Sequence, residues 1–63
     1  MKIYLVRIEQ GFDDYTHYSV EYTTTIEDEA IAKAINLKSK YQKGTHIIIE
    51  VWENGEWKKD LDF

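Results

Sequence analysis

The chain has 63 residues and a formal net charge of −4, with 43% hydrophobic and 14% aromatic residues and no proline. A chain of this length forms one domain at most, residues 1–63, and its hydrophobic content argues against disorder. Cysteine is absent, which excludes disulfides, thiolate metal sites and a cysteine nucleophile.

No run of residues approaches the roughly 18 apolar side chains of a membrane span. Arg7 and Glu9 interrupt the apolar N-terminal stretch, which therefore lacks the core of a signal peptide. These features predict a cytoplasmic protein without a membrane segment.

The first half of the chain reads as two strands joined by a loop. Residues 2–10 carry apolar side chains at both odd and even positions, which is typical of a central strand. Residues 10–14 contain Gly11 and two aspartates, which predict a loop longer than two residues. Residues 15–23 alternate, and one face of this second strand is expected to carry Tyr18, Val20 and Tyr22.

Residues 24–44 predict a helix, because their apolar side chains recur at steps of three and four residues. Thr24 with Glu27, or Thr25 with Asp28, is expected to form a capping box, and Gly44 to end the helix in a left-handed conformation. Acidic residues in the first turn and lysines near the end oppose the helix dipole favourably. The expected apolar stripe consists of Ile26, Ala30, Ile31, Ala34, Ile35, Leu37 and Tyr41.

Residues 46–53 predict a third strand, and Asn54-Gly55 predicts a type I′ turn into a fourth. A two-residue turn sets the register of the two strands, and the residues after Leu61 are expected to be loose. The expected cross-strand pairs are Glu53–Glu56, Trp52–Trp57, Glu50–Lys59 and Ile48–Leu61.

The predicted fold is α+β, with one helix packed on a four-stranded antiparallel sheet in the order β-β-α-β-β. Placing the first strand between the second and third permits a right-handed crossover and puts the lysine-bearing fourth strand at an edge. The row Ile47, Ile49 and Val51 is assigned to the helix side. The face with the two tryptophans then has no second helix to cover it.

The sequence does not predict an enzyme, a cofactor or a metal site. Its glycines are isolated and its serines stand in no nucleophile motif. His17 and His46 lack the spacing of zinc ligands. A carboxylate cluster at Asp13-Asp14 is most simply a solvated turn. A basic cluster on the helix could contact phosphates, although dipole complementation and solvation are the simpler explanation; its members are Lys33, Lys38, Lys40 and Lys43.

The aromatic residues favour a protein-binding function, since Trp and Tyr dominate the energetics of protein interfaces. A homodimer that uses the open sheet face, or rings that only complete a small core, explain the same residues. The acidic balance disfavours nucleic acid. The residues expected to bind a partner are Trp52, Trp57, Ile48, Glu50, Glu53 and Glu56, together with Asp13 and Asp14.

In general build, the chain resembles the small phage-encoded inhibitors of host defence, of the anti-CRISPR and anti-restriction type. The shared features are the short acidic chain without cysteine and the sheet-plus-helix body ending in Trp52-Glu53-Asn54-Gly55-Glu56-Trp57. The resemblance implies binding to a host enzyme that handles nucleic acid, such as a CRISPR nuclease. Several such inhibitors imitate DNA with rows of carboxylates. Here the candidate rows are Glu50, Glu53, Glu56, Asp60 and Asp62, and Glu9, Asp13, Asp14 and Glu21.

Overall fold

A computed structural model describes residues 1–12, 15–41 and 45–63, with the side chains of residues 12 and 15–17 left aside. These residues form β1 (Lys2–Phe12), β2 (Tyr15–Thr24), α1 (Glu27–Lys40), β3 (Thr45–Glu53) and β4 (Glu56–Asp62). The strands make one antiparallel sheet in the spatial order β2-β1-β3-β4. The α+β architecture and the central position of the first strand are confirmed.

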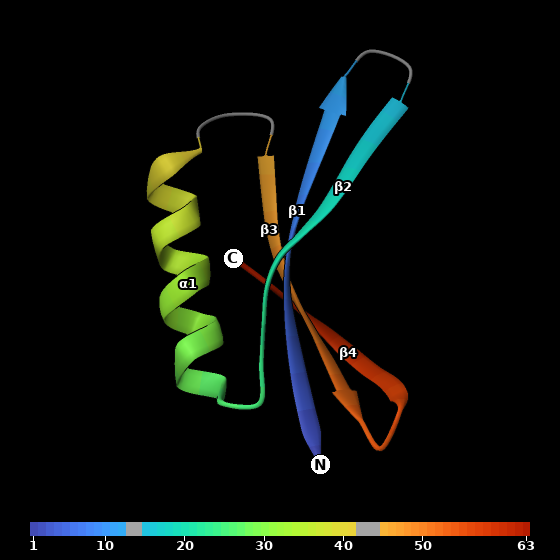
Figure 1. Cartoon of the computed structure of the whole chain (residues 1–63). Coiled ribbons are helices and arrows are strands. Elements are labelled where there is room, and N and C mark those ends of the chain that lie inside the picture. Colours follow the sequence, from blue (N-terminus) through green and yellow to red (C-terminus); the bar gives the residue numbers. More distant parts are fainter. Residues whose placement is uncertain (13–14, 42–44) are drawn as a thin grey trace.

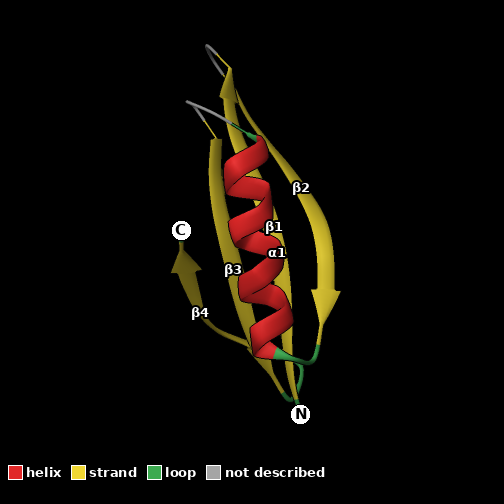
Figure 2. Ribbon diagram, turned by 90° about the vertical axis from the view of Figure 1, so that its left-hand side faces the viewer, coloured by secondary structure: helices red, strands yellow, loops and turns green. Residues whose placement is uncertain are grey.

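The helix lies along one face of a twisted sheet, over β1 and β3, as Figures 1 and 2 show from two directions. Ala30 and Ala34 are fully buried, and their small side chains bring the helix close to the strands. The predicted row on β3 faces the helix, because Ile47, Ile49 and Val51 all belong to the core beneath it. Within the described ranges, no helix has the length and apolarity needed to cross a membrane.

The helix is shorter than expected. It begins after Ile26, whose N–H donates to Thr24 Oγ1 at 3.1 Å, and no side chain caps its N-terminus. Both predicted capping boxes are therefore wrong: Thr24 still belongs to β2, and its hydroxyl donates to Glu29. The helix ends at Lys40, because Tyr41 turns to an extended conformation and packs against the core. Gly44, the predicted cap, lies outside the described residues.

A bulge in β2 changes which face its side chains occupy. Tyr22 lies opposite Val6, but Val20 lies opposite Arg7, so Glu21 is an extra residue in the strand. An extra residue reverses the alternation of side chains. Tyr22 therefore points to the helix side while Tyr18 and Val20 stay on the other, and the prediction of one shared face is wrong.

The β3–β4 hairpin has the predicted turn, with positive φ at Asn54 (53°) and Gly55 (81°). Trp52 pairs with Trp57 and Glu53 with Glu56, as expected. Beyond that point Lys58 is an extra residue, since Val51 pairs with Lys59. The predicted pairs Glu50–Lys59 and Ile48–Leu61 are therefore wrong, and the observed pairs are Glu50–Asp60, Ile49–Leu61 and Ile48–Asp62.

Two expectations about chain ends and loops also fail. Strands β1 and β2 pair as far as Phe12 and Tyr15, so only residues 13–14 separate them and the predicted longer loop is wrong. The C-terminal residue is not loose, because its N–H donates to Ile47 O at 3.0 Å and its ring packs against the core, as does Leu61.

Candidate functional site

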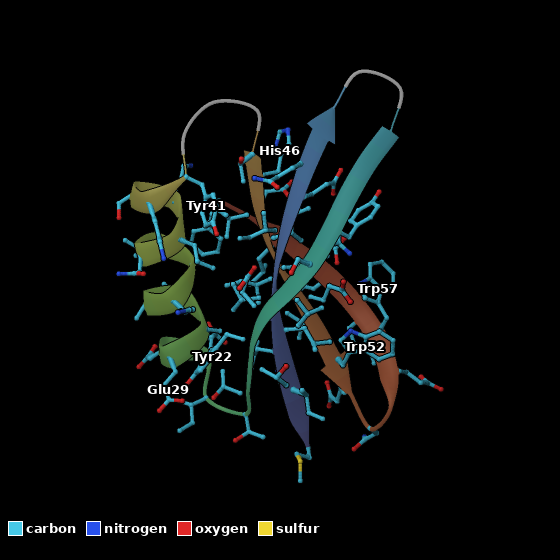
Figure 3. All side chains as sticks on the ribbon, turned by 45° about the horizontal axis from the view of Figure 1, so that its top comes forward. Tyr22, Glu29, Tyr41, His46, Trp52 and Trp57 are labelled. Atoms are coloured by element: carbon cyan, nitrogen blue, oxygen red, sulfur yellow. The ribbon has the colours of Figure 1, made fainter. Side chains whose placement is uncertain are left out.

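The sheet surface opposite α1, termed the open face, is covered by none of the described elements (Figure 1). Alternation along the strands, with the two bulges included, determines its composition. Figure 3 shows Trp52 and Trp57 on this side, away from the helix. The described residues of the open face include Ile3, Leu5, Arg7 and Glu9 on β1, Tyr18, Val20 and Thr23 on β2, His46, Ile48, Glu50 and Trp52 on β3, and Trp57, Asp60 and Asp62 on β4.

Large apolar side chains remain accessible at both sides of the open face. Tyr18 and Val20 on the β2 edge are 57% and 56% exposed, and Trp57 on the β4 edge is 53% exposed. Ile48 is buried between them at 8%. Exposed apolar surface rimmed by polar groups is typical of an interaction site.

An ion network organises the centre of the open face around Arg7. Arg7 Nη1 donates to Glu50 Oε2 at 2.5 Å, while Nη2 lies 3.7 Å from Glu9 Oε2 and 3.9 Å from Asp60 Oδ2. The guanidinium carbon also lies 5.4 Å from the centre of the Tyr18 ring, within the range of a cation–π interaction. Side chains from β2, β3 and β4, together with Glu9 on β1 itself, thus surround this one guanidinium.

Both tryptophan rings are held in place by their indole N–H groups. Trp52 Nε1 donates to Glu50 Oε1 at 2.9 Å, and Trp57 Nε1 donates to Asp60 Oδ1 at 2.8 Å. The carboxylates that surround Arg7 therefore also orient the rings. An aromatic side chain fixed before binding loses little conformational entropy when a partner covers it.

The structure brings together some of the residues predicted to bind a partner and separates others. Ile48, Glu50, Trp52 and Trp57 lie together on the open face. The strand pleat places the cross-strand pair Glu53–Glu56 on the opposite side of the hairpin, so these two cannot rim the tryptophans as predicted. Asp13 and Asp14 lie outside the described residues.

Sequence reasoning missed Arg7, and it named Asp60 only as a member of a candidate carboxylate row. Arg7 carried a signal, because a charged residue between apolar neighbours on a central strand must find partners on a sheet face. The place of Asp60 beside Arg7 carried no signal, since uninterrupted alternation from the turn assigns it to the helix side, and only the bulge at Lys58 moves it to the open face.

A second polar cluster joins the helix to the end of β2. The Tyr22 hydroxyl donates to Glu29 Oε1 at 3.3 Å (Figure 3). Lys33 Nζ lies 6.0 Å from the centre of the Tyr22 ring. The charge of Glu29 is the main cause that raises the pKa of Tyr22. Burial raises the pKa of Tyr4, and its hydrogen bond to Glu27 adds to the effect. A shallow hollow here is lined by Tyr22, Glu29, Ala32, Lys33 and Asn36.

The other candidates from the sequence are the histidine and carboxylate side chains and the lysines of the helix. Across residues 1–12, 15–41 and 45–63, no three His, Asp or Glu side chains converge in a way that could hold a metal ion. Lys33 lies over Tyr22, Lys38 and Lys40 occupy the last helical turn, and Lys43 lies outside the described residues. The chain matches no protein-family model, no curated protein and no solved structure.

Proposed function

We propose that the chain is a small acidic protein-binding module and that its open face is the contact surface. The observation that carries the proposal is Trp57, a half-exposed ring anchored by Asp60 on a sheet face without a covering layer. Interface hot spots are enriched in Trp, Tyr and Arg, and tend to lie among contacts that exclude water. Trp57, Tyr18 and Arg7 supply all three types within one face.

Charge supports a separate protein rather than a second copy as the occupant. Among the described residues assigned to it, the open face carries the carboxylates of Glu9, Glu50, Asp60 and Asp62 against the guanidinium of Arg7, with His46 opposite Glu9 formally neutral. Two copies stacked through this face would oppose acidic surface to acidic surface, which is unfavourable across an interface. The partner's contact surface is therefore basic.

Basic surfaces of this kind are characteristic of enzymes that handle nucleic acid, because such enzymes must bind phosphates. We therefore propose, as the specific form of this function, inhibition of a nucleic-acid-handling enzyme of the kind that phage inhibitors target. The support is charge complementarity and the placement of the aromatic rings. Glu53 and Glu56 lie on the other face, so the proposed contact uses rings and an ion network instead of one long acidic row.

The experiment compares Trp57→Ala with Ile35→Ala as a matched control. Ile35 is 58% exposed on the helix, close to the 53% of Trp57, so both changes remove a similarly accessible apolar side chain. A protein captured by the parent chain is purified, and its affinity is measured for all three proteins by titration calorimetry. Trp57→Ala should weaken binding by about 2 kcal/mol, or roughly 30-fold, while Ile35→Ala leaves it unchanged.

Light scattering on a sizing column tests the homodimer at the same time. The parent should remain monomeric into the millimolar range. A dimer that Trp57→Ala dissociates would replace the proposal with self-association. Capture of the same proteins by the parent and by Trp57→Ala would refute the open face as a contact surface.

A further inference from the structure

The charges around Arg7 do not balance. The carboxylates of Glu9, Glu50 and Asp60 surround one guanidinium, which leaves an excess of two negative charges. Glu50 takes the direct hydrogen bond to Arg7. Glu9 and Asp60 lie 3.7 Å and 3.9 Å from Arg7 Nη2, beyond ordinary hydrogen-bond length, and their side chains are 28% and 38% exposed. Both therefore keep acceptor capacity toward anything that covers the face.

A partner that covers this face must supply positive charge. Burying a carboxylate without a cation costs several kcal/mol, so a neutral or apolar partner would be penalised at both Glu9 and Asp60. A free anion or a phosphate backbone would be repelled by the negative charge of these carboxylates. The site selects a cationic side chain.

The protein's own Arg7 shows what kind of cation this surface accommodates. Its guanidinium lies over the Tyr18 ring while bonding to the Glu50 carboxylate. A second ring and carboxylate stand beside it: the Trp57 ring is half exposed, and Asp60 is held by the indole N–H through Oδ1 while its Oδ2 faces the network. Among the described residues no cation lies over the Trp57 ring, and Asp60 shares the single guanidinium of Arg7 with Glu9 and Glu50.

We propose that the partner docks an arginine on the open face, with its guanidinium against the Trp57 ring and hydrogen-bonded to Glu9 and Asp60. This inference rests on the proposed function and names the chemistry of its partner. Arginine fits better than lysine, because its planar, weakly hydrated group both stacks on an aromatic ring and donates to two carboxylates. Trp is the strongest of the aromatic partners for a cation.

The test titrates a hexa-arginine peptide into the isotope-labelled chain and follows the Trp57 indole N–H signal by NMR. Hexa-lysine and hexa-citrulline are the comparison peptides, since citrulline keeps the shape of arginine without its charge. Hexa-arginine should bind saturably and more tightly than hexa-lysine, and hexa-citrulline should not shift the Trp57 signal.

Two double variants with the same change in net charge separate the site from general acidity. Glu9→Gln with Asp60→Asn should weaken hexa-arginine binding by about tenfold or more, the usual effect of removing charge partners at an interface. Glu53→Gln with Glu56→Gln, on the other face, should change it much less. If the first double variant fails to fold, as judged by its melting curve, Glu9→Gln is compared with Glu53→Gln, which changes the net charge equally.

Equal weakening by the two double variants would overturn the inference, because binding would then follow net charge only. Failure of hexa-arginine to shift Trp57, or equal affinity for hexa-lysine, would overturn it as well. These outcomes are distinct from failure of the proposed function. A captured protein that depends on Trp57 but not on Glu9 and Asp60 would uphold protein binding and reject the arginine. Arginine binding without any Trp57-dependent protein would do the reverse.

Discussion

Replacing Arg7 with methionine should destabilise this protein more than any other single change of charge among the described ion pairs. Methionine keeps most of the apolar stem and removes the guanidinium, so the carboxylates of Glu9, Glu50 and Asp60 remain clustered without their cation. The Arg7 and Glu50 side chains are only 21% and 15% exposed, so the pair should behave much like a buried ion pair. Breaking a buried pair costs about 3–5 kcal/mol, and the remaining exposure favours the lower end, about 3 kcal/mol.

That loss is large for a chain of this size. Small domains have a free energy of unfolding of roughly 0.05–0.15 kcal/mol per residue, or about 3–9 kcal/mol here. Arg7→Met should therefore lower the urea midpoint strongly, as followed by tryptophan fluorescence at neutral pH. Adding Glu50→Gln should restore part of the stability, because it removes the stranded charge and keeps an oxygen that can accept from Trp52 Nε1.

The control is the Lys58–Glu56 pair on the same hairpin. Its nitrogen and oxygen lie 3.4 Å apart, but the side chains are 49% and 77% exposed, so solvent screens the interaction. Lys58→Met should change the free energy of unfolding by less than about 1 kcal/mol. Equal losses for Lys58→Met and Arg7→Met, or no recovery on adding Glu50→Gln, would refute the view that the Arg7 network stabilises the fold by compensating buried charge.

Three further predictions concern the turn, the core and the response to alkaline pH. Gly55→Val should cost more than about 1 kcal/mol of stability in a thermal melt, because φ at Gly55 is +81°. Gly11→Val in β1 is the control: a new Cβ meets no atom within 4 Å at either site, so only the backbone conformation differs. Equal melting temperatures for the two variants would contradict the strained turn. Leu37→Ala should cost about 2–5 kcal/mol, because its side chain is only 4% exposed and is the largest that the helix buries; a loss no greater than that of Ile35→Ala would be inconsistent with this core. The pKa of Tyr22 is raised in the folded state, mainly by the charge of Glu29, so the protonated phenol contributes to stability. This contribution is complete below the usual tyrosine pKa of about 10 and is lost as the pH rises through the folded pKa. The free energy of unfolding, measured from about pH 9 to about pH 11, should therefore fall less steeply with pH for Tyr22→Phe than for the parent. The same slope for both proteins would count against the Glu29 contact.

Local patterns in the sequence determined the elements and their order. The three- and four-residue spacing of Ala30, Ala34 and Leu37 produces the buried side of α1, although Ile26 and Ile35, which were predicted in the same stripe, are 52% and 58% exposed. The apolar residues on both faces of β1 place that strand in the middle of the sheet. Asn54-Gly55 determines the turn, because positive φ at two successive positions is tolerated by few residues. Each of these features depends on neighbours in the sequence, and each was predictable.

Only the tertiary structure decided which side chains share the open face. The bulges at Glu21 and Lys58 each insert one residue, and one residue reverses every side chain that follows. The first takes Tyr22 to the helix, where its hydroxyl donates to Glu29. The second turns Leu61 to the helix side of the sheet, where it packs against the core. The second bulge also carries Asp60 to Arg7. The reason is energetic and non-local: a bulge forms where contacts with distant elements outweigh a regular ladder, and no pattern within β2 or β4 records those contacts.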